Sequence, residues 1–191
     1  MDHTQQSEIN NCLKVLRKGG TILYPTDTIW GIGCDATNRK AVDKVYKIKK
    51  RLESKSLIVL LDDIKKISAY VDQVQDIAKA LVETVESPLT IIYPGAKNLA
   101  KNLIAEDGSI AIRIINNEFC STLIREFRKP IVSTSANISG QPAPLIFKCV
   151  PQEIVSQVDY IVKIDQEDIR ETKPSTIVKI QQNGEFEIIR R

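Results

Sequence analysis

The sequence predicts a mixed α/β fold in which helices flank a twisted sheet. In the first two thirds of the chain, segments with helical apolar spacing alternate with short runs of β-branched residues. The last third holds mainly strand-like runs, which argues against a purely parallel sheet. With 191 residues, of which 42% are hydrophobic, the chain has the size and apolar content of a single domain spanning residues 1–191.

Amphipathic spacing predicts five helices. The first covers about residues 6–18, where Ile9, Cys12, Leu13 and Leu16 share one face and Gly19 ends the helix. Asn38 is a candidate N-cap for the second, whose last turn is rich in lysine and arginine. The other helices are expected at 63–70, after Asp72, and at about 119–127.

Short β-rich runs predict the strands, which are expected at 21–24, 57–61, 89–93, 109–114, 159–164, 175–180 and 185–190. Residues 182–184, Gln-Asn-Gly, are a candidate hairpin turn between the last two. Two polar loops follow apolar runs, at 25–28 and at 133–140. These loops are the first places to look for chemistry.

Several reaction types are excluded by what the chain does not contain. His3 is the single histidine and lies in a terminus prone to fraying, so a Ser-His-Asp or Cys-His device is not expected. There is no P-loop and no G-x-G-x-x-G, and four scattered cysteines suggest neither a metal site nor a redox pair. Without a signal-like or membrane-spanning apolar run, we expect a cytoplasmic protein.

The candidate site residues each have a simple structural explanation as well. Lys49, Arg51 and Lys55 could converge on a polyphosphate, but basic residues also favour a helix C-terminus and solvent. Residues 26–28 could be turn formers only. Residues 133–137 could form a turn that opens a helix.

Taken together, these segments resemble the YrdC/Sua5 family of threonylcarbamoyl-AMP synthases. The similar segments are YPTDTIWGIG at 24–33, KKR at 49–51 and STSANISG at 133–140, in the family's order and at its intervals. The segment KPSTIV at 173–178 is similar to a further family motif. The resemblance covers nearly the whole chain.

The resemblance implies a YrdC-like twisted mixed sheet with an open, concave, basic cavity. It implies an enzyme that makes threonylcarbamoyl-AMP and pyrophosphate from L-threonine, bicarbonate and ATP, for a tRNA modification that downstream threonylcarbamoyl-transfer proteins complete. Mg²⁺ would be carried by the ATP phosphates, with no metal site of the protein's own.

The family's site residues map onto this chain in two groups. Lys49, Arg51, Ser135 and Asn137 match its catalytic and nucleotide-binding residues, with Lys55 and Arg190 as further phosphate ligands. For L-threonine, the matching positions are Thr28, Arg113, Ser133 and Ser175. The chain departs from the family at Leu60, where many members carry a histidine near the threonine.

Two other functions remain open on the sequence. One, implied by the concave basic face of the family's fold, is a module that binds double-stranded RNA or tRNA without this turnover. Because the chain has few aromatic residues and no single-strand-binding motif, such binding would be to the RNA backbone. The other is a regulator that binds nucleotide without turnover.

Overall fold

The computed structural model describes residues 3–51, 57–168, 174–181 and 183–190. Its helices, with 3-10 turns written as η, are α1 (His3–Arg17), α2 (Arg39–Lys49), η1 (Ile64–Ala69), α3 (Asp76–Thr84), η2 (Lys101–Leu103), α4 (Glu118–Phe127), η3 (Phe147–Cys149) and α5 (Gln152–Val155). Its strands are β1 (Ile22–Pro25), β2 (Trp30–Asp35), β3 (Ile58–Leu61), β4 (Leu89–Tyr93), β5 (Ile110–Ile114), β6 (Ile131–Ser135), β7 (Tyr160–Ile161), β8 (Thr176–Ile180) and β9 (Phe186–Arg190).

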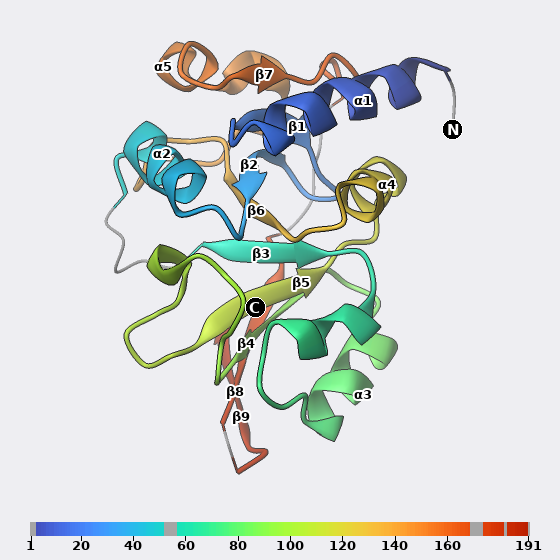
Figure 1. The fold of residues 1–191 in the computed structure, drawn as a ribbon, viewed down its shortest axis with the longest axis vertical. Coiled ribbons are helices and arrows are strands. Elements are labelled where there is room, and N and C mark those ends of the chain that lie inside the picture. Colours follow the sequence, from blue (N-terminus) through green and yellow to red (C-terminus); the bar gives the residue numbers. More distant parts are fainter. Residues whose placement is uncertain (1–2, 52–56, 169–173, 182, 191) are drawn as a thin grey trace.

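The described strands form one sheet in the order β7-β1-β2-β6-β3-β5-β4-β8-β9. The pairs β1/β7, β3/β5 and β4/β8 are parallel, and the other neighbours are antiparallel. In Figure 1 the sheet runs down the long axis of the molecule, with the β8–β9 hairpin at the end opposite α5 and β7. The mixed, twisted α/β sheet expected from the sequence is confirmed.

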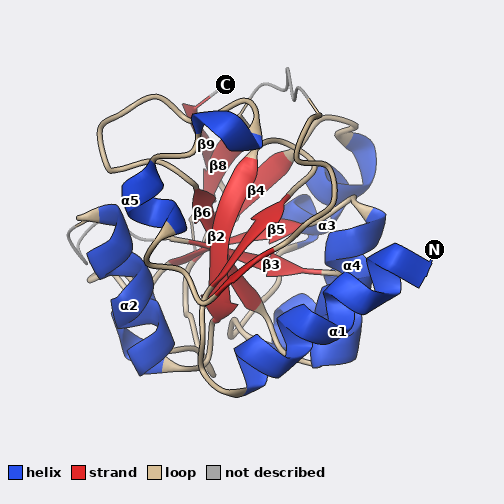
Figure 2. Ribbon diagram, turned by 90° about the horizontal axis from the view of Figure 1, so that it is seen from above, coloured by secondary structure: helices blue, strands red, loops and turns tan. Residues whose placement is uncertain are grey.

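Two hydrophobic clusters separate the helices by face of the sheet. Helices α1 and α4 lie together on one face, where Leu16 and Leu123 pack with Tyr24 and Ile131. Helix α2 covers the other face, and its Val45 packs with the side chains that point that way from β1 and β2. Figure 2 shows α1 and α4 side by side and α2 across the sheet from them. This arrangement follows from the alternation of side chains along each strand.

The boundary of α2 is set by local chemistry. Asn38 accepts hydrogen bonds from the backbone N–H groups of Lys40 and Ala41, which makes it the predicted N-cap. At the other end Lys50 adopts a left-handed conformation (φ 49°), and its N–H bonds to the last carbonyls of the helix. Lys49 is therefore the last helical residue, and Arg51 lies beyond the cap of the helix.

Most predicted elements are confirmed, and two bounds are wrong. The helix expected after Asp72 begins only at Asp76, and the strand expected at 159–164 is limited to Tyr160–Ile161. The last hairpin is confirmed, with a backbone hydrogen bond of 2.8 Å from Gln181 to Glu185 and a left-handed Gly184 (φ +85°). Of its expected turn, Gln182 lies outside the described residues.

Two stretches of strand were not predicted. Strand β2 contains Gly31 and Gly33, which have low β-propensity, yet it pairs with β1 on one side and β6 on the other. Strand β6 continues to Ser135, into residues expected to be loop, because Ser133 and Ser135 pair with those same glycines. Long-range pairing has overridden local preference in both.

Candidate active site

One threonine hydroxyl shapes the loop after β1. Thr26 Oγ1 donates to the carbonyl of Ile29 at 2.7 Å and accepts from the N–H groups of Thr28 and Ile29 at 3.1 and 3.2 Å. Such side chain to backbone bonds are the reason threonine favours tight turns. The turn places Asp27 and Thr28 beside the end of β5, where both contact Arg113.

A cavity of about 360 Å³ opens next to this loop, on the face of the sheet that α1 and α4 cover elsewhere. Ile131 of β6 packs with those helices, whereas Ser133, two residues further along the same face, lines the cavity. The floor continues in register through Ile58 of β3, Ala111 of β5 and Ile92 of β4. The cavity therefore lies where the sheet extends past its helical cover.

The polar lining of the cavity is cationic and rich in hydroxyls. It consists of Arg51, Arg113, Arg190, Thr26, Thr28, Ser133, Thr134, Ser135 and Ser175, and no Asp or Glu is among the described lining residues. A Cβ atom at Gly31 would lie 3.3 Å from Ser133 Oγ and 3.4 Å from the Thr26 methyl group, so glycine keeps this corner open. The lining suits an anionic ligand that also carries hydroxyl groups.

Arg113 is the buried cation of the site, with 6% of its surface exposed. Its Nη2 forms an ion pair with the Asp27 carboxylate, and its Nη1 lies 3.5 Å from Thr28 Oγ1. Nε makes no hydrogen bond in the described structure, and neither does Asp27 Oδ1. Because buried donors are normally satisfied, Arg113 retains hydrogen-bonding capacity for a ligand in the cavity it lines.

Ser175, directly before β8, connects a second arginine to the site. Its hydroxyl lies 2.8 Å from Thr90 Oγ1 of β4. Its carbonyl accepts from Nη2 and Nε of Arg190, at 2.8 and 3.2 Å. Burial, and secondarily the charge of Arg113, lower the pKa of Arg190. Two arginines repelling one another across one cavity favour an anion between them.

Lys49 lies behind the cavity wall. Only 1% of its surface is exposed, and its Nζ donates to the carbonyls of Ser135 and Asn137 at 2.5 and 2.7 Å. Arg51, two residues on, does line the cavity. Burial and, to a smaller extent, the charge of Arg51 lower the pKa of Lys49 to about 8.

Asn137 belongs to the same inner layer. It is 7% exposed, its Oδ1 lies 3.4 Å from Lys49 Nζ, and its Nδ2 donates to the carbonyls of Ile138 and Gln141. It does not line the cavity.

The structure brings most of the predicted site residues together. The seven that line the cavity are Thr28, Arg51, Arg113, Ser133, Ser135, Ser175 and Arg190. Lys49 and Asn137 contact each other behind this lining. Lys55 lies outside the described residues, as does Lys173 of the last motif. Leu60 is 2% exposed and belongs to the hydrophobic cluster under α1 and α4, so it does not line the cavity.

Several residues at this site had no site role assigned from the sequence, among them Asp27, Gly31 and Thr90. Asp27 offered a signal, because it is the only charged side chain within the 24–33 segment and a buried arginine requires a partner. Asp27 also lines a second cavity, of about 580 Å³, together with Asp62 and Glu86. The Asp27–Arg113 pair therefore stands between two cavities.

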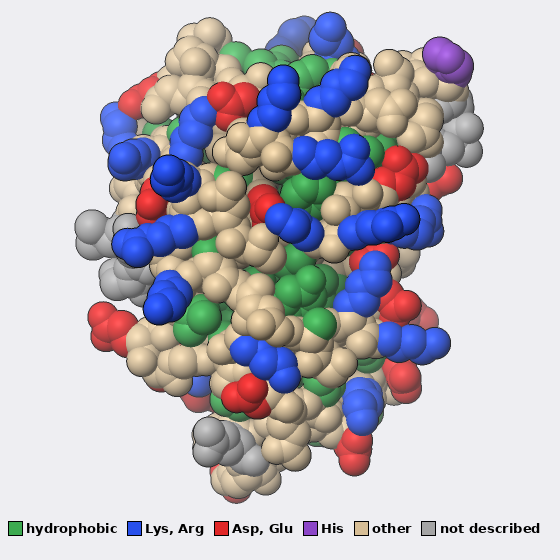
Figure 3. Space-filling model, viewed as in Figure 1, with side chains coloured by type: hydrophobic (Ala, Val, Ile, Leu, Met, Phe, Trp, Pro, Cys, Tyr) green, Lys and Arg blue, Asp and Glu red, His purple; other side chains and the backbone are tan. Residues whose placement is uncertain are grey.

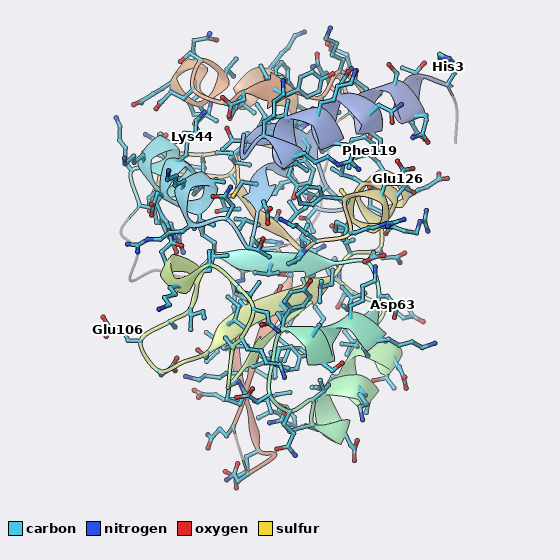
Figure 4. All side chains as sticks on the ribbon, viewed as in Figure 1. His3, Lys44, Asp63, Glu106, Phe119 and Glu126 are labelled. Carbon is cyan, nitrogen blue, oxygen red and sulfur yellow. The ribbon has the colours of Figure 1, made fainter. Side chains whose placement is uncertain are left out.

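Other catalytic devices are not found in the part of the chain that the structure describes. His3 lies at the outer end of α1 (Figure 4) and does not line the cavity. The described residues contain no group of three His, Cys, Asp or Glu side chains that could hold a metal ion. Nor do they include a helix with the length and apolarity needed to cross a bilayer.

Comparison with known proteins gives consistent matches. The Sua5/YciO/YrdC family profile, described as telomere recombination, matches residues 14–191. The threonylcarbamoyl-AMP synthase of Pseudoalteromonas translucida is 36% identical over 184 residues, which are 95% of this chain and 97% of that protein.

Two solved structures share the fold. E. coli YciO aligns with a TM-score of 0.84 and 23% identity over 98% of this chain and 89% of its own. The P. abyssi Sua5 structure complexed with L-threonine aligns with a TM-score of 0.82 and 24% identity over 90% of this chain, which spans half the length of that protein. Because the profile matches residues 14–191 and the P. translucida protein is 36% identical over nearly its whole length, the chain belongs to the Sua5/YciO/YrdC family.

Proposed function

We propose that the protein is a threonylcarbamoyl-AMP synthase, a nucleotidyltransferase that uses L-threonine, bicarbonate and ATP. One observation carries the proposal: a single cavity holds a buried arginine with an unused N–H among hydroxyl groups, and also a second arginine at the end of α2. An amino acid and a nucleotide phosphate could occupy the two parts together. The relatives that bear this name over nearly the whole chain length support it.

The amino-acid end of the cavity is formed by Arg113 and its neighbours. The guanidinium would hold the threonine carboxylate, because Nε is a buried donor without a partner. Thr28, Ser133 and Ser175 offer hydroxyl groups to the threonine side chain, and Ile58 offers an apolar contact to its methyl group. This set suits a small side chain that is both polar and branched.

The nucleotide end is formed by Arg51 and Ser135, with Lys49 and Asn137 behind them. Arg51 would bind the phosphates and spread the negative charge that develops in nucleotidyl transfer. Because the described lining has no carboxylate, Mg²⁺ would be held by the phosphate oxygens. Arg190, whose pKa is lowered by burial and by the nearby charge of Arg113, would face the junction of the two substrates.

The reaction follows in two steps. The threonine amine forms a nitrogen–carbon bond to CO₂ derived from bicarbonate, with net release of water, and gives a carbamate. A carbamate oxygen then attacks the α-phosphorus of ATP, and pyrophosphate leaves with the electron pair of the broken phosphorus–oxygen bond. No side chain needs to form a covalent bond. The residues hold the two substrates in line and stabilise charge.

The test is pyrophosphate release by the purified protein with ATP, threonine and bicarbonate. We expect release only when both threonine and bicarbonate are present. Serine should be poorer, because a lost methyl contact costs about 1–3 kcal/mol in a fitted pocket. Equal turnover of threonine, serine and valine would refute the assignment of the pocket.

Binding of tRNA or double-stranded RNA is the alternative to test in parallel. On the face shown in Figure 3, Lys and Arg side chains are spread out with Asp and Glu between them. Binding to the RNA backbone would weaken steeply between low and physiological salt, whereas pyrophosphate release would depend on threonine and bicarbonate. We also propose a cytoplasmic location, in keeping with four cysteines that form no disulfide.

A further inference from the structure

Lys49 has used all of its hydrogen-bond donors inside the protein. An ammonium group has three N–H donors. In the structure they face three acceptors, the Ser135 carbonyl at 2.5 Å, the Asn137 carbonyl at 2.7 Å and Asn137 Oδ1 at 3.4 Å. With 1% of the residue exposed, no donor remains for a ligand in this arrangement.

The backbone of Lys49 fixes the same loop from its other end. Its carbonyl accepts from the N–H of Ser139 at 3.0 Å. Asn137 closes the loop internally, because its Nδ2 donates to the carbonyl of Gln141 at 2.6 Å. The segment from Ser135 to Gln141 is thereby attached to the last residue of α2.

This attachment joins two parts of the cavity wall. Ser135, at the end of β6, and Arg51, two residues after Lys49, both line the cavity. The bonds of Lys49 to the loop, through its side chain and its carbonyl, therefore connect these two parts of the wall and help to fix their relative position.

We propose that Lys49 is a positioning residue, which holds Ser135 and Arg51 in register for the reaction and does not itself contact the nucleotide. The inference rests on the proposed function and refines it, since of the two cations Lys49 and Arg51 it leaves only one in contact with the ligand. Arg51 is then the cation that reaches the phosphates. The presence of both the 49–51 and the 133–140 segment in one chain then has a structural reason, because Lys49 of the first binds the carbonyls of Ser135 and Asn137 of the second.

A double-mutant cycle tests this through kinetics. Lys49→Met should lower kcat about 10²-fold, as a misplaced catalytic group does. If Lys49 acts through Ser135, the kcat of the Lys49→Met/Ser135→Ala double variant should be little lower than that of the less active single variant, because the effects of residues that act as a unit do not add. Additive losses, or rescue by Lys49→Arg, would overturn the proposal, because an arginine could still reach phosphates but cannot replace the compact ammonium among three acceptors.

Lys47→Met is the matched control. Lys47 lies two positions before Lys49 on the same helix, and its side chain is exposed. The substitution therefore removes the same charge as Lys49→Met without removing the bonds to the loop. It should keep wild-type kcat and KM. A comparable loss in this variant would show a general effect of charge and count against a specific role for Lys49.

A measurement on the wild-type protein covers the case in which Lys49→Met does not fold. Acetic anhydride acylates accessible neutral amines, and mass spectrometry locates the labelled lysines. An accessible lysine with a pKa of about 8 would be among the most reactive. We expect Lys47 to be labelled and Lys49 to stay unlabelled, with ATP and without it. If Lys49 is labelled in the free protein and ATP prevents this labelling, Lys49 contacts the ligand directly, and the proposal is overturned.

The two proposals fail separately. Wild-type protein that releases no pyrophosphate with threonine would refute the function and leave the labelling pattern as the test of Lys49. Wild-type turnover with ATP-protected labelling of Lys49 would support the function and refute the positioning role.

Discussion

The ion pair between Asp27 and Arg113 makes the sharpest energetic prediction. The Arg113 side chain is 7% exposed and the Asp27 side chain 14%, so water screens the pair little. Asp27→Asn keeps the shape and an acceptor oxygen but removes the negative charge. Arg113 is then a buried cation without a counter-ion.

The expected loss follows from what remains in the variant. Breaking a buried pair by removing one partner costs about 3–5 kcal/mol, and a charged hydrogen bond alone contributes about 1.5–3 kcal/mol. Because asparagine retains a polar contact, we expect a loss of roughly 2–3 kcal/mol in the free energy of unfolding. For a domain of this size that is about 4–12 °C in melting temperature, at roughly 2–4 °C per kcal/mol.

Threonine should compensate part of this loss. A ligand carboxylate beside Arg113 would supply the missing negative charge, so saturating threonine should raise the melting temperature more in Asp27→Asn than in the wild type. Urea unfolding and thermal melts with and without threonine measure both effects. A loss under about 0.5 kcal/mol, or a smaller threonine effect in the variant, would refute the reasoning.

Asp62→Asn is the matched control for the same substitution. Asp62 lines the same second cavity as Asp27, but its partner Lys66 has a side chain that is 43% exposed. The Asp62 side chain is only 8% exposed, but its substitution leaves Lys66 in contact with water and not as a buried cation, so we expect a cost of about 1 kcal/mol. The control should therefore lose less stability than Asp27→Asn and show no added response to threonine.

Three further predictions follow from the same geometry. Arg51→Ala should slow pyrophosphate release by roughly 2–4 kcal/mol in transition-state terms with the fold intact, whereas Lys50→Ala, at a side chain 61% exposed, should be nearly silent; equal losses would refute a specific contact. Gly33→Ala should destabilise by about 1–3 kcal/mol in urea, because the new Cβ would lie 2.7 Å from Tyr24 Cε1; an unchanged midpoint would contradict this. The pKa of Lys49, lowered to about 8 from its ordinary 10.5, predicts that kcat falls as pH rises through 8. Above pH 8 the unfolded state binds more protons at this group than the folded state, so deprotonation of Lys49 makes the free energy of unfolding rise with pH. A fall in melting temperature in parallel with kcat would refute the assignment of the kinetic pKa to Lys49.

The helices α1 to α4, the turn η1 and most strands could be predicted from the sequence because their signals are local, whereas the short η2, η3 and α5 were not predicted. Apolar periodicity located α1 and α4, and Asn38 was identified as the cap of α2 before its hydrogen bonds were seen. The segments that carry the site were also recognisable from sequence, since residues 24–33, 49–51 and 133–140 resemble one family.

Tertiary structure alone decided how those segments work. Strand β2 exists because two neighbours pair with its glycines, which no local propensity favours. Asp27 and Arg113 are 86 positions apart, and only the fold brings the two charges into contact. Sequence spacing likewise could not say which of Lys49 and Arg51 lines the cavity, because that depends on where α2 ends and on which carbonyls of the loop after β6 converge on Lys49. Local chemistry determines which elements form, whereas the direction and burial of a charged side chain are settled by partners distant in the chain.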